Sequence, residues 1–410
     1  MRLLIVSQYF WPENFRINDL VVDMVGRGHE VTVLTGQPNY PSGRFFPGYG
    51  CLSHHAEQYH GARIVRVPLV PRGSACAFCL VLNYLSFAVF GALGAWLRLR
   101  GKFDAIFVFE VSPITVGIPA IVASRRFNAP ILFWVLDLWP ESLSAAGGVR
   151  SPWILRSVER LVRWVYRNCA RVLVQSRAFI PEIARHGVAA SRILYFPSWG
   201  ESLFQALSQA DTALLPPLPA GFKILFAGNI GEAQDLPAIL TAAEHLRDRA
   251  DMHWLILGDG RVAAWAKDEA LRRNLTQVHF LGRYPLEMMP HFYAVADALL
   301  LSLKREPIFT LTIPGKLQSY LASARPILAM LDGEGARIVR EAEAGLACSA
   351  GDAAGLAAHA LKMEAMPEAA RREMGLNGQK YYAENFNRTH LLDQLEIWLE
   401  EAMQERKKSK

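Results

Sequence analysis

Cysteine is scarce in this sequence, with five in 410 residues. Five are too few for a disulfide framework in a chain of this size, and an apolar run at 3–7 stands where a signal peptide would begin. We therefore expect a cytosolic protein. Cys76 and Cys79 have the spacing of a metal or redox pair, but no second pair or histidine cluster accompanies them. Small buried side chains are the favoured interpretation.

Patterns for binding nucleic acid, metal or a dinucleotide are also missing. The net charge is +6, yet the basic residues are dispersed without interleaved aromatics, which argues against a nucleic-acid binder. No acidic cluster has metal-ligand spacing, so we expect neither a metal ion nor a cofactor. His54, His55 and His60 leave a metal site open, although a solvated loop is favoured. Neither glycine loop of the second half reads GxGxxG, which disfavours an NAD-dependent oxidoreductase.

Apolar residues are abundant, and their spacing predicts the fold. They make up 51% of the chain, enough for two sizeable cores. Short apolar runs alternate with helix-length amphipathic segments, a pattern typical of α/β proteins with doubly wound parallel sheets. Two Rossmann-like domains in tandem are therefore expected. The predicted strands are 3–7, 30–35, 63–67, 105–109, 131–135, 172–175 and 193–196, then 223–227, 253–257, 278–281, 298–303, 326–330 and 346–348.

Prolines mark the join between these domains. A helical pattern at 202–214 is followed by Pro216, Pro217 and Pro219, which forbid further helix. We place the first domain at 1–215 and the second at 216–380. The last segment, 381–410, predicts an amphipathic helix at 382–403 and a basic tail, which either returns to the first domain or ends as a solvated, frayed terminus.

Residues 73–97 contain no charged side chain, and basic residues flank them on both sides. The length permits a membrane span, but the stretch falls between two strands of one cytosolic sheet. We expect a shallow helix whose basic ends contact anionic head groups, so that 73–100 attach the protein peripherally to the inner face of the cytoplasmic membrane. A fully buried core helix is the alternative.

Glycines follow two of the expected strands in the second half, in Gly228-Asn229-Ile230-Gly231 and Gly258-Asp259-Gly260. Such glycines let the backbone turn sharply and approach a ligand, and the following helix points its free N–H groups at an anion. Pro314-Gly315-Lys316 opens a third helix and adds a cation at its positive end. One such loop is compatible with a structural turn, whereas three favour a bound nucleotide diphosphate.

Several stretches resemble the family-4 glycosyltransferases, which have the GT-B fold of two Rossmann-like domains facing a cleft. They are 9–13, 27–34, 38–41, 137–142, 228–231 and 313–316. The likeness covers nearly the whole chain and is strongest to the subgroup of O-antigen N-acetyl-fucosaminyltransferases, which extend lipid-linked saccharides of bacterial surface polymers. Membership implies that the reaction retains the anomeric configuration.

The resemblance also implies roles for residues of the second domain. Gly228, Asn229, Gly231 and Lys316 would face the donor diphosphate, and Arg283 and Tyr284 would lie beside the base. Glu334 would approach the ribose or the sugar. Glu306 stands where many members carry the first of two acidic residues, and Ser319 replaces the second.

The first domain would hold the acceptor. Glu110 and Asp137 end two of its strands, and we expect this pair to position the acceptor hydroxyl, with the choice of proton acceptor left open. A helix N-cap is the alternative role for Asp137. Lys316 would neutralise the leaving phosphate. The remaining acceptor candidates are Asn14, Arg16, Asn39, Tyr40 and Trp139; surface charge competes as the role of Arg16, and packing as that of Trp139.

The sequence thus predicts a retaining, metal-independent glycosyltransferase at the membrane surface. It would move a sugar, an N-acetylated deoxyhexose by the resemblance, from a UDP-sugar to a polyprenyl-diphosphate-linked saccharide in O-antigen or capsule synthesis. One alternative is a UDP-sugar epimerase or hydrolase of the same fold. Another is a non-catalytic nucleotide-sugar-binding protein, since a fold does not fix a function.

Overall fold

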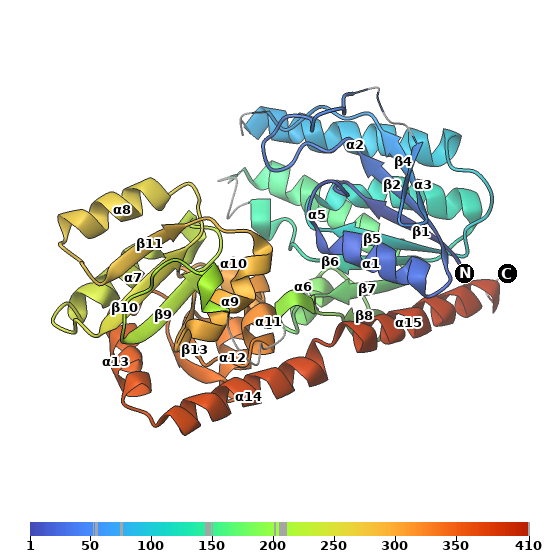
Figure 1. Ribbon diagram of the computed structural model, residues 1–410. Helices are drawn as coiled ribbons and strands as arrows, with labels where there is room; N and C mark the ends of the chain where they lie inside the picture. The colour runs from blue at the N-terminus through green and yellow to red at the C-terminus, as the bar shows by residue number, and fades with distance from the viewer. Residues whose placement is uncertain are drawn as a thin grey trace. The chain divides into compact units, whose positions relative to one another are not determined.

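The computed structural model describes residues 1–51, 53, 56–73, 77–143, 149, 151–200, 202–204 and 211–408. The chain forms two compact units (Figure 1). The first consists of Met1–Pro197 together with Leu391–Lys410, and the second of Ser198–His390. The first unit therefore ends before the expected boundary at 215, and of the C-terminal segment predicted at 381–410 it includes the part from Leu391 onward.

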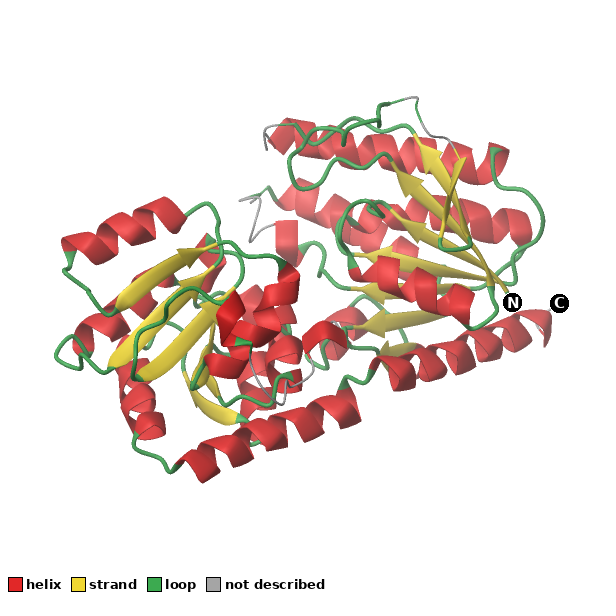
Figure 2. Cartoon of the chain, in the orientation of Figure 1, coloured by secondary structure: helices red, strands yellow, loops and turns green. Residues whose placement is uncertain are grey.

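The first unit contains an eight-stranded sheet in the order β3-β4-β2-β1-β5-β6-β7-β8 (Figure 2). Only β3 is antiparallel to its neighbour, β4. Every strand expected in this half is present, but β3 was not predicted because its four residues include no apolar run and alternate between exposed and half-buried positions. The strands are β1 (Arg2–Ser7), β2 (Glu30–Gly36), β3 (Ala56–Tyr59), β4 (Ala62–Val67), β5 (Ala105–Glu110), β6 (Ile131–Val135), β7 (Arg171–Val174) and β8 (Ile193–Tyr195).

Helices cover both faces of this sheet. The strand order reverses between β1 and β5, and right-handed crossovers then place α1 on one face and α2, α3 and α5 on the other. In that second layer α2 packs on α3, and α3 packs on α5. The helices of the unit are α1 (Arg16–Gly26), α2 (Ala77–Leu97), α3 (Gly117–Phe127), α5 (Pro152–Arg167), α6 (Phe179–Arg185) and, for most of its length, α15 (Arg388–Lys408).

The second unit contains a six-stranded, wholly parallel sheet in the order β11-β10-β9-β12-β13-β14. All of its strands were expected, and the α/β prediction with two doubly wound sheets is confirmed. The strands are β9 (Phe222–Ala227), β10 (Met252–Leu257), β11 (Val278–Gly282), β12 (Ala298–Ser302), β13 (Ile327–Met330) and β14 (Gly345–Cys348). The helices are α7 (Leu236–His245), α8 (Ala263–Arg272), α9 (Met289–Val295), α10 (Pro307–Leu311), α11 (Gly315–Ala322), α12 (Gly333–Glu341), α13 (Ala353–Glu364) and α14 (Glu368–Asn385).

Two helix predictions were wrong in their extent. Short 3-10 turns at Ser202–Phe204 and Thr212–Leu214 stand where a helix was expected over 202–214, and 205–210 lie outside the described residues. The single helix expected at 382–403 is the end of α14 and most of α15, interrupted after Asn385.

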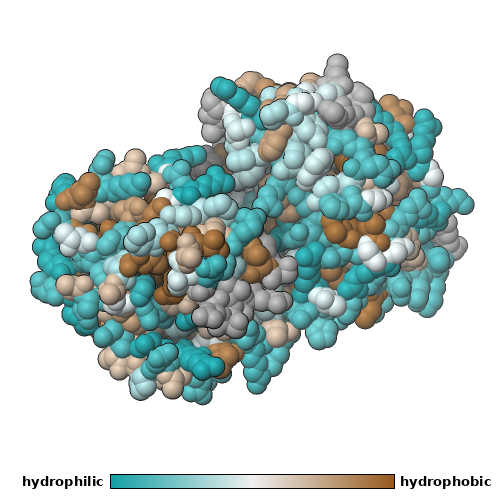
Figure 3. Space-filling view, viewed as in Figure 1, coloured by the Kyte–Doolittle hydropathy of each residue, from teal (hydrophilic) through white to brown (hydrophobic). Residues whose placement is uncertain are grey.

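The helix α2 has its polarity reversed relative to a surface helix of a soluble protein. Its polar Asn83 is fully buried, whereas Phe78, Leu85 and Trp96 are each more than half exposed. Within the described residues it is the one helix long and apolar enough to cross a membrane; the most apolar 18 residues of Phe78–Leu97 have a mean hydropathy of 1.9, and 33% of them are buried. The face of the protein seen in Figure 3 is, by contrast, largely hydrophilic with scattered hydrophobic groups.

Candidate functional site

The end of β9 lies where the strand order of the second sheet reverses, between β9 and β12. Open parallel sheets bind ligands outside the carboxyl ends of their strands at such a point. The chain turns here through Gly228 (φ 135°), and the neighbouring β10 ends in Gly258 (φ 133°). A side chain at Gly258 would collide with the Gly228 carbonyl. Only glycine fits this contact, which leaves the backbone of both loops open to a ligand.

Lys316 reaches the same edge from the first turn of α11. Its Nζ lies 3.7 Å from the centroid of the Phe226 ring and would lie 2.8 Å from a Cβ placed on Gly228. Nζ is buried, has no hydrogen-bond acceptor in the described part of the chain, and burial lowers the pKa of Lys316 to about 7. A buried amine without a partner is costly to charge unless an anion binds beside it. The geometry therefore suits a phosphate group.

Tyr320 fixes α11 against the end of β9. Its hydroxyl accepts a hydrogen bond from the Ala227 N–H at 3.2 Å and donates to the Ala227 carbonyl at 3.3 Å. Tyr320 lies one helical turn after Lys316, so these bonds also hold the lysine over the glycine turn. Among the described residues no side chain caps the amino end of α11, which leaves the N–H groups of Gly315 and Lys316 available to an anion, whereas the Leu317 N–H donates to the Pro314 carbonyl at 2.9 Å.

The other predicted residues of the two glycine loops lie around this point. The Ile230 N–H donates to the Asp259 carbonyl at 2.9 Å, which ties one loop to the other. The Gly231 and Gly260 backbones approach the Asn229 side chain so closely that a Cβ on either would contact it. The structure thus brings together the residues predicted from both loops and from α11, including Gly315.

The remaining donor candidates differ in their exposure and in their partners. Arg283 is exposed and Tyr284 half-buried after β11, and Glu306 follows β12 at the reversal point. Glu334 is 6% exposed and forms an ion pair with Arg337 at 2.9 Å. Its carboxylate already has a partner, so a contact with the ribose would require it to share that pairing.

Two carboxyl groups follow neighbouring strands of the first unit. Glu110 ends β5 and is fully buried, and neither of its carboxyl oxygens has a hydrogen-bond partner among the described residues. Burial, together with the charge of Asp137, raises the pKa of Glu110 well above its usual range. Burial also raises the pKa of Asp137, to about 6, although a hydrogen bond from Ser142 opposes this. Burial thus favours the neutral form of Glu110, while a pKa of about 6 leaves Asp137 mostly ionised near neutral pH.

Three acceptor candidates differ in their surroundings. Trp139 is 8% exposed, and its ring packs edge-on against Tyr84 of α2 with centroids 6.3 Å apart, which favours the packing alternative. Asn14 is exposed. Arg16 opens α1 and lies 3.7 Å from Asp19, so it acts at least partly as a surface ion pair.

Glu13 is a residue whose importance the sequence reasoning missed. It is buried, and its carboxylate accepts the N–H groups of Phe10 at 3.1 Å, Asn39 at 2.8 Å and Tyr40 at 2.7 Å. Burial raises its pKa to about 7. Glu13 therefore joins the loops after β1 and β2, and its place in the 9–13 motif was the available signal. Asn39 is fully buried in this network, which favours a structural role.

Arg72 is a second missed residue, because the sequence showed it only as a basic flank of an apolar stretch. Its guanidinium lies 5.2 Å from the centroid of the Tyr40 ring and donates to the Tyr9 hydroxyl at 3.1 Å. Its backbone N–H donates to the Asn39 side chain at 3.0 Å. A half-buried guanidinium held on aromatic rings at the carboxyl edge of the sheet can bind an anionic acceptor group.

The structure also bears on the histidines and cysteines. Among the described residues, no group of three or more His, Cys, Asp or Glu is arranged to hold a metal ion. His60 is exposed in a turn, and His54 and His55 lie outside the described residues.

Cys79 is half-buried and disulfide-bonded, so the interpretation of Cys76 and Cys79 as small buried side chains was wrong for Cys79. Cys76 lies outside the described residues.

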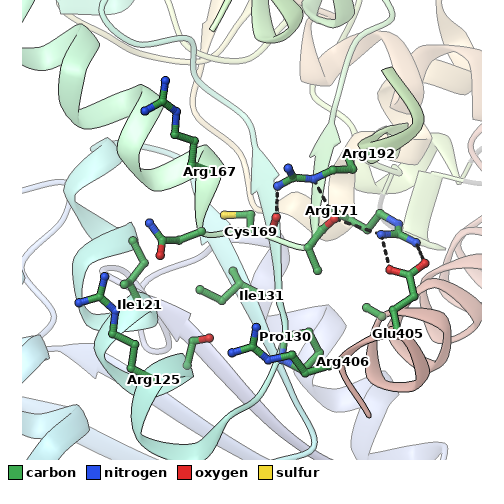
Figure 4. Close-up of a pocket in the computed structure, with 14 residues that line it drawn as sticks. Ile121, Arg125, Pro130, Ile131, Arg167, Cys169, Arg171, Arg192, Glu405 and Arg406 are labelled. Carbon is green, nitrogen blue, oxygen red and sulfur yellow. Dashed lines mark hydrogen bonds and ion pairs between the residues drawn. The ribbon is translucent and has the colours of Figure 1, made fainter. Parts of the chain in front are cut away.

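A pocket of about 470 Å³ lies at the opposite, amino-terminal edge of the first sheet (Figure 4). The starts of β6 and β7, the ends of α3 and α5, and α15 line it. Arginines dominate the lining, and the one acidic group, Glu405, pairs with Arg171 at 2.9 Å. No predicted site residue lines this pocket, so it is separate from the strand-end sites above.

Comparisons with known proteins agree with this architecture. Residues 14–199 match the family described as a glycosyl transferase 4-like domain, and residues 221–365 match the glycosyl transferases group 1. A curated relative from Escherichia coli (strain K12), named for colanic acid biosynthesis as the glycosyl transferase WcaI, is 28% identical over 335 residues, which cover 78% of this chain and 81% of that protein.

Solved structures show the same fold at low sequence identity. Sucrose-phosphate synthase (tll1590) from Thermosynechococcus elongatus superposes with a TM-score of 0.71 at 16% identity, over 97% of this chain and 98% of that one. Anabaena Alr3699/HepE in complex with UDP and glucose gives a TM-score of 0.70 at 14% identity, over 98% and 99%. With one family match in each unit and two parallel Rossmann-like sheets, the chain belongs to the family-4, or group 1, glycosyltransferases of the GT-B fold.

Proposed function

We propose that this glycosyltransferase moves a sugar from a UDP-sugar to a polyprenyl-diphosphate-linked saccharide during the synthesis of a bacterial surface polysaccharide. The observation that carries the donor assignment is the buried Nζ of Lys316, which lies over the Gly228 turn without an acceptor among the described residues. The relative named for colanic acid biosynthesis supports the proposed role in polysaccharide synthesis, and a protein of the same fold solved with UDP and glucose supports the proposed UDP-sugar donor. An N-acetylated deoxyhexose remains our proposal for the sugar, and retention of configuration for the outcome.

In the proposed reaction, different groups of the protein stabilise the leaving diphosphate and accept the proton of the acceptor hydroxyl. The bond between the anomeric carbon and the β-phosphate oxygen breaks, UDP leaves with the electron pair, and the acceptor oxygen forms the new bond to that carbon. Protonated Lys316 and the loop N–H groups stabilise the charge on the departing diphosphate. The acceptor hydroxyl gives its proton to Asp137, whose pKa of about 6 leaves it mostly ionised near neutral pH, while Glu110, whose neutral form is favoured by burial, positions the hydroxyl. This scheme needs no metal ion.

We also propose that residues 73–100 attach the protein to the inner face of the cytoplasmic membrane, where lipid-linked acceptors lie. The inverted polarity of α2 supports this. Asn83 accepts a hydrogen bond from Gln8 at 2.7 Å and donates to the Val70 carbonyl at 2.6 Å, so the polar side of the helix contacts the loops of the sheet. Its apolar side is left to a non-aqueous neighbour, unlike that of a core helix.

One experiment tests the function. Purified protein is incubated with a panel of UDP-sugars and a lipid-linked acceptor, and the product is weighed by mass spectrometry. We expect one donor to add one sugar mass to the acceptor, in the presence of EDTA as well. UDP release or a changed donor sugar without acceptor would instead support the hydrolase or epimerase. Donor binding without any turnover would support a non-catalytic binding protein.

A further inference from the structure

We propose that α5 is a second membrane contact, whose solvent face binds the anionic phospholipid surface beside α2. This inference rests on the proposed membrane attachment but not on the proposed sugar transfer. Sequence reasoning assigned lipid contact to residues 73–100 alone. The structure adds a helix from another part of the chain.

The exposed side of α5 carries large apolar residues that a soluble surface does not need. Trp153 is 77% exposed, Ile154 49% and Trp164 37%. The two tryptophans are eleven residues apart in sequence. At 3.6 residues per turn they return to within about 20° of each other, on one side of the helix. The opposite side, with Val162, Val165 and Tyr166, is buried against the unit.

Arginines share the face with these tryptophans. Arg156, Arg160, Arg163 and Arg167 are all exposed, and by helical periodicity they lie on the same side as Trp153. The acidic side chain on the helix, Glu159, is paired with Arg163. Arg160 and Arg167 have no hydrogen-bond or ion-pair partner within the described residues. Tryptophan and arginine together are the side chains favoured at the boundary between lipid head groups and acyl chains of an anionic membrane.

The fold presents α5 and α2 in one layer. Both helices lie on the same face of the first sheet, with α3 packed between them. Arg125 of α3 and Arg167 of α5 both line the arginine-rich pocket at the amino-terminal edge of the sheet (Figure 4), so basic side chains continue from α5 to α3 at this end of the layer. A flat bilayer surface lying over the layer would contact the apolar side of α2 and the Trp–Arg side of α5 together. This positive charge favours an anionic lipid surface over an apolar protein groove.

The test is flotation of the purified full-length protein with phosphatidylcholine vesicles, with and without phosphatidylglycerol. We expect the double variant Trp153→Ala/Trp164→Ala and the triple variant Arg156→Gln/Arg160→Gln/Arg167→Gln each to bind anionic vesicles at least about fivefold more weakly than wild type. The triple variant should also lose most of the preference for phosphatidylglycerol. Matched substitutions on α8 of the second unit, Trp265→Ala/Leu271→Ala, remove side chains that are 44% and 79% exposed and should leave vesicle binding unchanged.

UDP affinity and thermal melting of each variant separate this inference from folding and from the proposed function. Unchanged UDP affinity and melting with weakened flotation would support it, whether or not a sugar acceptor is ever found. Wild-type flotation by both α5 variants would overturn it. So would equal weakening by the α8 control, or binding of α5 to a copurifying protein in place of vesicles.

Discussion

The Lys316 side chain lies directly over the α-carbon of Gly228, so that a Cβ at that glycine would come 2.8 Å from Nζ and closer still to Cε. The Lys316 side chain thus occupies the space that a side chain at Gly228 would need. A diphosphate bound at the loop would meet both the open backbone and the amine. In the proposed donor site these two residues would therefore act in combination.

Replacing Gly228 by alanine should remove donor binding. The methyl group would displace Lys316, and alanine is strained at φ 135°. We expect UDP affinity to fall at least about tenfold and stability to fall by about 1–3 kcal/mol. Calorimetry with UDP and thermal melting measure the two effects. Gly26→Ala, where no atom lies within 4 Å of the added methyl, is the control and should behave as wild type.

UDP binding should take up a proton above pH 7. Burial lowers the pKa of Lys316 to about 7, and a bound diphosphate would favour the charged amine. Affinity should then weaken by up to about tenfold per pH unit above 7, and calorimetry in buffers of different ionisation enthalpy should report the proton. Lys316→Met should abolish the proton uptake. Proton-independent binding by the wild type would contradict a role for this amine.

The same lowered pKa has a consequence for stability without ligand. The ordinary pKa of a lysine is 10.5, so between about 7 and 10.5 the unfolded chain binds a proton that the folded chain does not. Unfolded-state protonation favours unfolding, and this residue's contribution to stability therefore rises with pH through that window. Comparing the wild type with Lys316→Met isolates the effect.

Asp137→Asn should reduce kcat by at least about a hundredfold, because the amide cannot accept the hydroxyl proton. Glu110→Gln should cost only a few fold, since burial and the charge of Asp137 raise the pKa of Glu110 and favour the neutral form that glutamine resembles. The rate of the wild type should fall as pH drops through about 6, the pKa of Asp137. Turnover by Asp137→Asn close to the wild-type rate would remove Asp137 as the base.

Arg72→Ala should raise the KM for the lipid-linked acceptor by about tenfold, with little change in UDP affinity. The guanidinium is held on Tyr40 and Tyr9, where it can meet the acceptor diphosphate. Arg72→Lys retains the charge without the planar stack and should show a smaller effect. Initial rates against acceptor concentration measure this, and an effect confined to the donor would contradict it.

Substituting Leu85 and Leu93 on α2 by serine should move the protein from the membrane fraction to the soluble fraction. These side chains are 51% and 50% exposed, so we expect a change in stability within about 0.5 kcal/mol. The control is the pair Leu286→Ser/Leu376→Ser in the second unit, at 41% and 48% exposed. Cell fractionation with immunoblotting compares them, and retention of the α2 variant at the membrane would count against lipid contact.

The sequence predicted the features that depend on local residue patterns, namely the buried strands and the glycine turns that follow them. Buried strands read as apolar runs, and the glycines after β9 and β10 indicated where two loop backbones come close to each other. It did not predict β3, which depends on pairing with β4 and has no apolar run of its own. Glu13 was missed because its function arises from three backbone N–H groups of two loops that are distant in sequence. The distinction between Glu110 and Asp137 depends on burial, which spacing does not reveal.

The path of the backbone has a practical consequence for dissecting this enzyme. The chain leaves the first unit after Pro197 and re-enters it at Leu391, where Asp393 and Glu396 pair with Arg27 and Trp398 packs on Phe196. A protein truncated near residue 200 would therefore lack α15, and the part of the first unit on which α15 packs would be exposed. Independent expression of the two halves calls for a fusion of 1–197 to 391–410 through a short linker, or for supply of α15 as a separate peptide.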